Sequence, residues 1–200
     1  MKFYQVTGSL SEPISKVHEW IQEAETELVA LPHAMNLSSV NAEGKPSSRM
    51  VLLKRISPEG LVFFTDYEGN KGKQIKEFPF IALTFWWAKT NKQIRIEGKC
   101  KMVSDKENDE YFSSRPRGSQ ISASVSLQSA QIESYESLVQ KSQIFEEENS
   151  DKEIERPDRW GGFLIKPDSI EFWIDQSNRL HKRTLYTYDG TGWKTSLLSP

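Results

Sequence analysis

The feature that most constrains the fold is a run of short apolar segments, separated by turn signals, between residues 34 and 104. The turn signals include "NAEGKP" and "SPEG", and the segments between them are rich in Val, Phe, Leu, Ile and Thr. The predicted strands are "AMNLSSV", "SSRMVLLKRI", "LVFFTD", "FIALTFWWA" and "KQIRIEGKCKMVS". About five consecutive strands at this spacing predict an antiparallel barrel or sandwich.

Helical patterns flank these strands. Apolar residues at helical spacing predict an amphipathic helix from Ser11 to Leu31, with Ser11 as its N-cap and Pro32 ending it. Further helical segments are expected at "NKGKQIKEF", over 105–113 and over about 132–148, and four more strands at "GGFLIKP", "SIEFWID", "RLHKRTLYTYD" and "GWKTSLL". We therefore expect one mainly β domain over 1–200, with a helical segment over 1–33 and a barrel with peripheral helices over 34–200.

Composition limits the class of protein. The 200 residues suffice for a full core, because a chain of this size buries roughly 70% of its unfolded surface. The net charge of −2 gives no global attraction to nucleic acid or anionic lipid, and no run approaches the roughly 18 apolar residues that span a bilayer. The single cysteine, Cys100, excludes an intrachain disulfide, and the N-terminus lacks a signal-peptide pattern. A cytoplasmic protein without nucleic-acid or membrane partners is expected.

Several chemical motifs are missing. The three histidines lie far apart in the sequence and no cysteine pair exists, so no metal site is expected. We find no Gly-rich phosphate loop, dinucleotide fingerprint or nucleophile elbow. The short "RPRG" stretch lacks the wider basic patch that nucleic-acid binding requires.

The stretch "YFSSRPRGSQISASVS", residues 111–126, is the first candidate for function. Its two arginines, phenol and hydroxyls suit a phosphate, since guanidinium bonds phosphate bidentately and hydroxyls complete the shell. The alternative is a surface loop with incidental ion pairs.

Two other stretches hold basic residues in patterned positions. Arg49 and Lys54 lie five residues apart at the ends of an apolar strand, on opposite faces, and each charge there needs a partner. In "RLHKR", Arg179, His181 and Arg183 alternate and are predicted to share one face of a strand. An anion or an electron-rich ring would relieve their repulsion, and a solvated basic edge is the alternative.

Taken together, these residues resemble the pyridoxamine 5′-phosphate oxidase family. The motifs "RMVLLK", "YFSSRPRGSQISASVSLQS", "WGGF", "EFW" and "RLHKR" occur in the family's order and spacing, and the resemblance runs from about residue 35 to residue 200. It implies an FMN-binding split β-barrel that forms a homodimer with flavin at the subunit interface. It also implies oxidation of pyridoxamine or pyridoxine 5′-phosphate to pyridoxal 5′-phosphate, with oxygen reduced to hydrogen peroxide, in vitamin B6 biosynthesis.

The resemblance implies roles for individual residues. The substrate set, of which Arg179 and His181 are also the catalytic candidates, is Lys54, Tyr111, Arg115, Ser119, Arg179 and His181. The FMN set is Arg49, Met50, Val51, Leu52, Leu53, Lys54, Phe64, Thr65, Asn70, Lys71, Gln93, Gln128, Ser129, Trp173 and Arg183. Arg117 is interpreted as structural. Asn70 departs from the family pattern, because an arginine is usual there beside the FMN phosphate.

Two alternatives remain at this stage. One is a related FMN enzyme that oxidises another ring, such as a phenazine precursor, although such enzymes are expected to lose part of the substrate-phosphate set. The other is a flavin- or pyridoxal-phosphate-binding protein without turnover. Only the N-terminal segment, which has no match to the family's basic segment, favours the second.

Overall fold

The computed structural model describes residues 4–200, and within that range it holds a ten-stranded sheet, five α-helices and one short 3₁₀ helix. The strands are β1 (Gln5–Val6), β2 (Ala34–Val40), β3 (Pro46–Leu52), β4 (Arg55–Ser57), β5 (Gly60–Asp66), β6 (Phe80–Trp87), β7 (Lys92–Met102), β8 (Trp160–Ile174), β9 (Lys182–Tyr188) and β10 (Trp193–Leu198). The helices are α1 (Glu12–Thr26), α2 (Asn70–Glu77), α3 (Asp105–Ser113), α4 (Arg117–Val125), α5 (Tyr135–Glu148) and the 3₁₀ turn Ser177–Arg179.

The sheet curls because β3, at one end of the strand order, is followed in the chain almost directly by β4, which lies next to the other end. Its order is β1-β4-β5-β8-β7-β6-β2-β3, and only Leu53 and Lys54 separate β3 from β4. The strands pair antiparallel except for β1, which lies parallel to β4. Of the two architectures that the strand spacing predicted, barrel and sandwich, this is the antiparallel barrel, with a split where β3 and β5 face each other without pairing.

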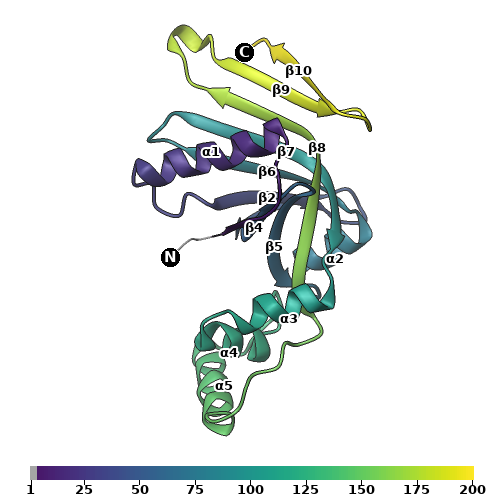
Figure 1. The fold of residues 1–200 in the computed structure, drawn as a ribbon. Helices are drawn as coiled ribbons and strands as arrows, with labels where there is room; N and C mark the ends of the chain where they lie inside the picture. Colours follow the sequence, from purple (N-terminus) through teal and green to yellow (C-terminus); the bar gives the residue numbers. More distant parts are fainter. Residues whose placement is uncertain (1–3) are drawn as a thin grey trace.

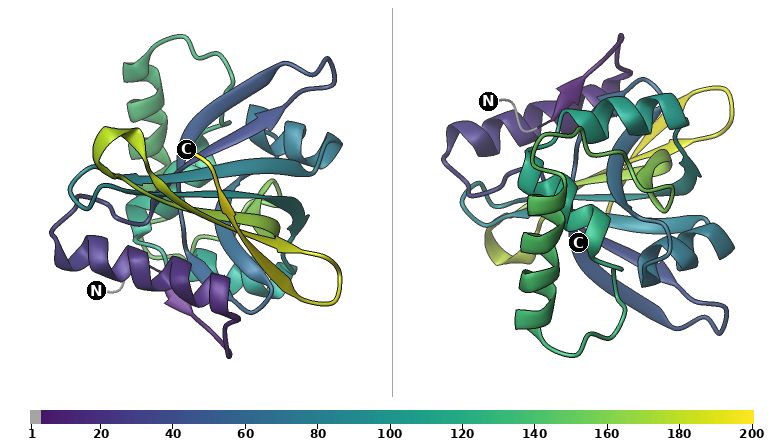
Figure 2. Two further views of the ribbon diagram at one scale, coloured as in Figure 1. Left: turned by 90° about the horizontal axis from the view of Figure 1, so that it is seen from above. Right: turned by 90° about the horizontal axis from the view of Figure 1, so that it is seen from below.

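The core lies inside this curled sheet. Alternate residues of the strands, such as Leu37, Phe63 and Phe85, are fully buried there. Helix α1 crosses the sheet (Figures 1 and 2) and buries its apolar stripe against it. Its Trp20 meets Phe172 of β8 edge-on, with ring centroids 5.0 Å apart.

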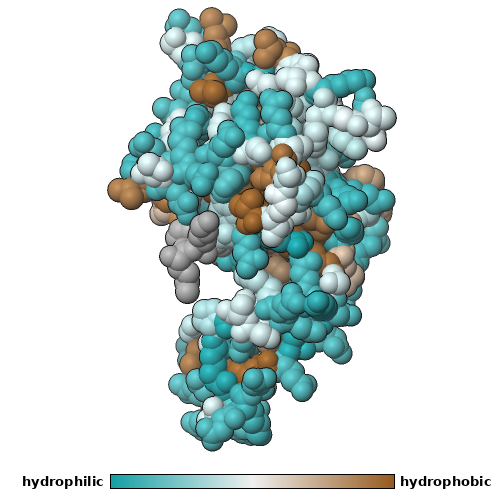
Figure 3. Space-filling view, in the orientation of Figure 1, coloured by the Kyte–Doolittle hydropathy of each residue, from teal (hydrophilic) through white to brown (hydrophobic). Residues whose placement is uncertain are grey.

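Helices α3, α4 and α5 form a lobe beyond one end of β8, and the β9–β10 hairpin lies at the other end (Figure 1). The surface of the helical lobe in Figure 3 is mostly hydrophilic, which agrees with the absence of any buried residue in α5. The long strand β8 therefore connects two distant regions of the protomer. Its first residue, Trp160, lies at the lobe, and its last residues pair with β9.

Two predicted boundaries are wrong. The first helix ends at Thr26 instead of Leu31, and Leu28 and Leu31 are exposed with φ values of 54° and 52°. Leu31 precedes Pro32, which disfavours helical backbone at that position. The predicted strand "SSRMVLLKRI" is interrupted at Leu53 and Lys54, so the opposite-face argument for Arg49 and Lys54 does not apply.

The segments predicted as "GGFLIKP" and "SIEFWID" form one continuous strand, β8. Pro167 does not end it, because the pairing with β7 is irregular at that level: Gly98 pairs with Pro167 and Glu97 with Ser169, so β8 holds one extra residue, Asp168. A proline is tolerated in a strand at such a bulge. The short strand β1 and helix α4, which spans much of the polar stretch 111–126, were not predicted.

The predicted alternation of Arg179, His181 and Arg183 on one strand is also wrong. Strand β9 begins at Lys182, and Arg179 lies in the 3₁₀ turn with a φ of 62°. Only Arg183 is part of the strand, so the three side chains do not share one strand face. Within residues 4–200, no helix is long and apolar enough to cross a membrane.

Candidate active site

A cleft of about 470 Å³ lies at the split of the barrel, between β3 and β5 and beside helices α3 and α4. Eleven of the residues predicted for substrate or FMN line it, together with Pro116 and Trp160. The eleven are Met50, Val51, Leu52, Lys54, Phe64, Thr65, Lys71, Tyr111, Arg115, Ser119 and Gln128. These residues come from five elements and three connections, so the fold collects them from across the sequence.

Lys54 and Arg115 form a pair of like charges in this cleft. Burial lowers the pKa of Lys54, and the nearby Arg115 guanidinium lowers it further. Burial also lowers the pKa of Arg115. Within residues 4–200 neither side chain has an ion-pair partner, and Nη1 of Arg115 is buried without a hydrogen-bond partner. Two desolvated cations without a counter-charge make a site for an anion.

Neutral donors surround this pair. Burial raises the pKa of Tyr111, so its phenol stays protonated at neutral pH and can donate to an anion. The ring of Tyr111 stacks on Phe64 of β5, with centroids 3.9 Å apart. Ser119 lies in the first turn of α4, where free backbone N–H groups and the helix dipole also favour negative charge.

A second pair of like charges, Arg49 and Lys71, belongs to the other side of the site. Burial lowers the pKa of Lys71, and Arg49 lowers it further, while Asp66 acts in the opposite direction. Arg49 points inward from β3 and donates hydrogen bonds of 2.6 Å to Ser39 Oγ and to Ser47 Oγ. The hydroxyls of both serines donate to Gln74 Oε1.

Lys71 is held by the residues around it. Its Nζ donates to Thr65 Oγ1 at 3.2 Å and to Gln128 Oε1. Lys71 is the second residue of α2, and the first, Asn70, has an exposed side chain. The backbone N–H of Asn70 donates to Ser129 Oγ at 3.3 Å. The helix start, Lys71 and the segment at Gln128 thus form one cradle.

This donor set fits FMN. Arg49, Lys71 and the start of α2 would provide a cationic subsite for its phosphate, and exposed Met50 and Leu52 of β3 would provide apolar surface for a flat ring. Leu53 does not line the cleft, because its side chain is fully buried in the core. The assignment of Leu53 to the FMN set stays a prediction.

Five predicted residues lie elsewhere in the protomer and do not line the cleft. They are Gln93, Trp173, Arg179, His181 and Arg183. Gln93 and Arg183 flank Trp173 on the neighbouring strands β7 and β9, and the His181 ring lies 4.5 Å from the Trp173 ring. Trp173 is separated from the cleft residue Trp160 by thirteen positions of one strand, roughly 40 Å of extended chain.

Glu171 fixes Arg183 in this second region. The Arg183 guanidinium donates to both carboxylate oxygens, at 2.7 Å and 3.1 Å. Arg95 donates to the same carboxylate at 2.9 Å. The hydrogen bond from Arg183 to Glu171 raises the pKa of Arg183. The charge of Arg183 is therefore compensated within the protomer, unlike that of Arg115.

The sequence reasoning missed Trp160, Gln74 and Ser39. Gln74 follows Lys71 by three residues on α2, so its position on the same helix face was a usable signal. Ser39 comes from a neighbouring strand, and nothing local indicated its contact with Arg49. Arg117, interpreted as structural, donates to the carbonyls of Asn149 and Lys152, in agreement with that interpretation.

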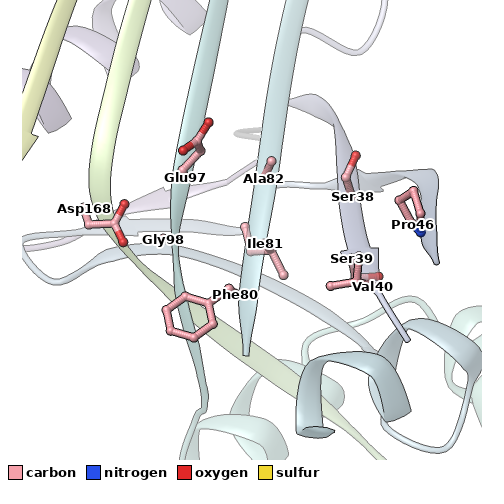
Figure 4. Close-up of a pocket in the computed structure, with 10 residues that line it drawn as sticks. All are labelled: Ser38, Ser39, Val40, Pro46, Phe80, Ile81, Ala82, Glu97, Gly98 and Asp168. Carbon is pink, nitrogen blue, oxygen red and sulfur yellow. The ribbon is translucent and has the colours of Figure 1, made fainter. Parts of the chain in front are cut away.

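A second cavity of about 320 Å³ opens over β2, β6 and β7 (Figure 4). Phe80, Ile81 and Ala82 form its apolar part, and the carboxylates of Glu97 and Asp168 lie at its edge. None of the predicted site residues lines it. In the part of the chain that the structure describes, no group of three or more His, Cys, Asp or Glu side chains could hold a metal ion.

The chain matches two family models. Residues 21–148 match the model described as pyridoxamine 5′-phosphate oxidase, and residues 160–200 match the pyridoxine 5′-phosphate oxidase C-terminal dimerisation region. Two relatives named pyridoxine/pyridoxamine 5′-phosphate oxidase, from Cyanothece sp. and Haemophilus influenzae, are each 42% identical over 188 residues. The alignments cover 94% of this chain and 88% and 89% of the relatives, respectively.

Solved structures agree with these matches. PhzG from Burkholderia lata 383, in complex with tetrahydrophenazine-1-carboxylic acid, has a TM-score of 0.90 at 30% identity, covering 95% of this chain and 93% of PhzG. A pyridoxamine 5′-phosphate oxidase-related, FMN-binding protein from Nostoc punctiforme has a TM-score of 0.76 at 17% identity, covering 96% and 99%. At 17% identity, the similarity to the Nostoc punctiforme protein supports the fold alone.

The fold and its cleft define the class, an FMN-binding split β-barrel. Within that class, the chain belongs to the pyridoxamine 5′-phosphate oxidase family, and residues 160–200 match that family's dimerisation region.

Proposed function

We propose that this protein oxidises pyridoxamine 5′-phosphate or pyridoxine 5′-phosphate to pyridoxal 5′-phosphate. Oxygen is the electron acceptor and hydrogen peroxide a product, and the amine substrate also consumes water and releases ammonia. The observation that carries the proposal is the presence of two cation pairs beside one cleft, Lys54 with Arg115 and Lys71 with Arg49. A phosphorylated substrate and a phosphorylated flavin each need one such pair.

The protein's own groups position the substrate. Lys54, Tyr111, Arg115 and Ser119 bind the phosphate, far from the carbon that reacts. This remote binding energy holds the reacting carbon in place, which raises the rate through orientation. FMN, when bound, supplies the redox chemistry. Met50 to Leu52, Phe64, Thr65 and Gln128 exclude water from one side of the flavin.

We further propose that the active site is completed by a second copy of the chain. Gln93, Trp173, Arg179, His181 and Arg183 form the complementary half. The support is the position of Trp160 and Trp173 thirteen residues apart on one continuous strand, which keeps the halves apart within a protomer. The match of residues 160–200 to a dimerisation region supports a homodimer. In the dimer, Arg179 covers the substrate ring and orients its 4′ substituent.

A second candidate substrate comes from the likeness to PhzG, whose structure holds a phenazine carboxylic acid. That ligand carries no phosphate, whereas this chain keeps the Lys54–Arg115 pair without a counter-charge. The higher identity to relatives named as oxidases of the phosphorylated vitamers also favours the first candidate.

Peroxide release tests the proposal. The FMN-loaded protein should release peroxide with pyridoxamine 5′-phosphate and far less with unphosphorylated pyridoxamine. Turnover only of a reduced phenazine carboxylic acid would favour the second candidate. Tight binding of pyridoxal 5′-phosphate without peroxide release from any of these compounds would indicate a binding protein.

A further inference from the structure

Trp160 begins β8 and lines the cleft, but none of the predicted roles includes it. Only 7% of this residue is exposed. Its ring is nearly parallel to those of Phe64 and Tyr111, with interplanar angles of 11° and 7° and centroid distances of 5.4 Å and 6.1 Å. Phe112 meets it edge-on at 5.2 Å. These contacts leave the indole a single orientation.

The guanidinium of Arg115 lies over this indole. Its central carbon is 4.4 Å from the Trp160 ring centroid and 5.5 Å from the Phe112 ring centroid. Within residues 4–200, the guanidinium makes no ion pair and no hydrogen bond, and its Nη1 is buried without a partner. Aromatic faces are therefore its main support. A cation over an indole is a favourable contact that gains strength when desolvated.

Support by aromatic rings leaves the N–H donors of Arg115 available to a ligand. A carboxylate partner would occupy the N–H donors and compete with an incoming phosphate, as Glu171 occupies those of Arg183. An aromatic face holds the plane of the guanidinium and uses none of its five N–H donors. The donors of Arg115 thus stay free for an anion in the cleft.

The residue before Trp160 anchors the same subsite. Arg159 pairs with Asp66 at 3.1 Å and donates to the carbonyls of Ala123 and Ser124 at 2.7 Å and 2.9 Å. Those carbonyls lie at the C-terminal end of α4, the helix whose first turn carries Ser119. Trp160 is itself paired with Asp66 in the sheet. Trp160 therefore belongs to a segment that connects β5 of the barrel with helix α4 of the phosphate subsite through fixed contacts.

We infer that Trp160 is a positioning residue for the substrate phosphate, acting through Arg115, whose guanidinium it holds flat and free of a carboxylate partner. This inference rests on the proposed oxidase function. It assigns Trp160 no contact with the reacting carbon and no part in holding FMN.

The first test compares Trp160→Leu with Trp160→Phe in the FMN-loaded dimer. Trp160→Leu should raise the KM for pyridoxamine 5′-phosphate by about tenfold, with kcat changed by less than about twofold. Trp160→Phe keeps an aromatic face and should restore most of the loss. Trp160→Met serves as a second non-aromatic variant if the leucine protein does not fold. The FMN dissociation constant should not change.

Phe63→Leu is the matched control. Phe63 is a fully buried ring on the opposite face of β5 from Phe64, so its loss lowers Tm without touching Arg115. Its KM should stay within about twofold of wild type. An equal rise in KM for Phe63→Leu and Trp160→Leu would overturn the inference, since general loosening of the fold would then explain both.

A double-mutant cycle tests whether Trp160 acts through Arg115. If Trp160 acts through Arg115, the Arg115→Ala/Trp160→Leu protein should have the KM of Arg115→Ala alone. Independent, multiplying effects would overturn the inference. If the wild type turns over no phosphorylated vitamer, the oxidase proposal fails. Titration with inorganic phosphate then decides the positioning role, which requires weaker binding in Trp160→Leu than in wild type and is overturned by equal binding.

Discussion

Arg115 and Arg183 are both partly buried arginines predicted to serve the active site, and their surroundings are opposite. Arg115 rests on aromatic rings with no carboxylate partner, and burial lowers its pKa. Arg183 is bound by both oxygens of Glu171, which raises its pKa. The guanidinium of Arg115 therefore keeps its N–H donors free for a ligand, whereas the charge of Arg183 is already compensated by a carboxylate of the same chain.

The same contrast separates the two ends of β8. At the Trp160 end, a cleft holds cations without counter-charges. At the Trp173 end, Arg183 and His181 are paired with carboxylates of the same chain, His181 Nδ1 with Asp175 Oδ1 at 3.0 Å. The first region has the chemistry of a binding site, whereas the second has that of a preformed surface presented to another molecule. We propose that this molecule is a second copy of the chain.

The largest effect is expected from removing the Arg115 guanidinium. Arg115→Ala should raise the KM for pyridoxamine 5′-phosphate by about 10- to 150-fold, the worth of a hydrogen bond to a charged group. Arg117→Ala is the matched control, because Arg117 binds backbone carbonyls of residues 149 and 152. Steady-state kinetics of both variants measures this. Similar KM values for the two would contradict the assignment of the phosphate to Arg115.

A change at the other end of β8 should affect a different kinetic constant. Arg179→Met should lower kcat by about 10- to 100-fold, because misplacement of the reacting carbon slows the chemical step. The KM should change much less, since the phosphate subsite is intact. An unchanged kcat with a raised KM would make Arg179 a binding residue instead.

A smaller effect is expected at Asn70, at the start of α2. Its neutral amide stands where the family usually has a cation beside the FMN phosphate, and its side chain is exposed. Asn70→Arg should tighten FMN binding by about tenfold, on the order of 1.4 kcal/mol, and the gain should shrink in high salt. Titration of apoprotein with FMN at low and high salt measures this. Equal dissociation constants at low salt would mean that Arg49 and Lys71 already satisfy the phosphate.

The smallest expected effect is a pH dependence from Lys54. Its pKa is lowered by burial and by Arg115, and the substrate phosphate favours its protonated form. Affinity should therefore be full below the lowered pKa and fall as pH rises through it, by less than about tenfold, and the loss should begin at a lower pH than for an unperturbed lysine. Lys54→Arg should remove this loss, because arginine stays charged. The pH profile of KM for both proteins is the measurement, and the same alkaline loss in Lys54→Arg would exclude Lys54 as its origin.

Local patterns predicted the strands and much of the barrel well. Strands β2, β5, β6 and β7 follow alternating or apolar runs between turn signals. Burial alternates along β2, β6 and β7, whereas β5, an apolar run, is buried along nearly its whole length. Where prediction failed, distant contacts decided the structure. Helix α4 is poor in strong helix formers, and it is held in place by contacts with other segments: Arg159 donates to the carbonyl of Ala123, and Arg117 of α4 donates to the carbonyl of Lys152. Strand β8 passes through Pro167 because its pairing with β7, a strand far away in the sequence, has a bulge there, with Asp168 of β8 as the extra residue.

The candidate site also divides into features that the sequence indicated and features that only the structure revealed. Its residues were named from the family resemblance, since residue spacing alone gave no sign that Lys54 and Arg115 meet. The structure places eleven of them together in the cleft. It also corrects the strand alternation of Arg179 and His181, which lie in a turn that local periodicity did not indicate. Trp160 was quoted only as part of the family motif "WGGF" and was given no role of its own.

The central claim is that each active site joins the Arg115 half of one chain to the Arg179 half of another. Arg115→Ala chains and Arg179→Met chains, carrying different affinity tags, can be co-expressed and the doubly tagged dimer purified. One of its two sites then has both native halves, so kcat/KM for pyridoxamine 5′-phosphate should recover to about half of the wild-type value per dimer. Activity no higher than the mean of the two mutant homodimers, or no doubly tagged dimer at all, would contradict the account.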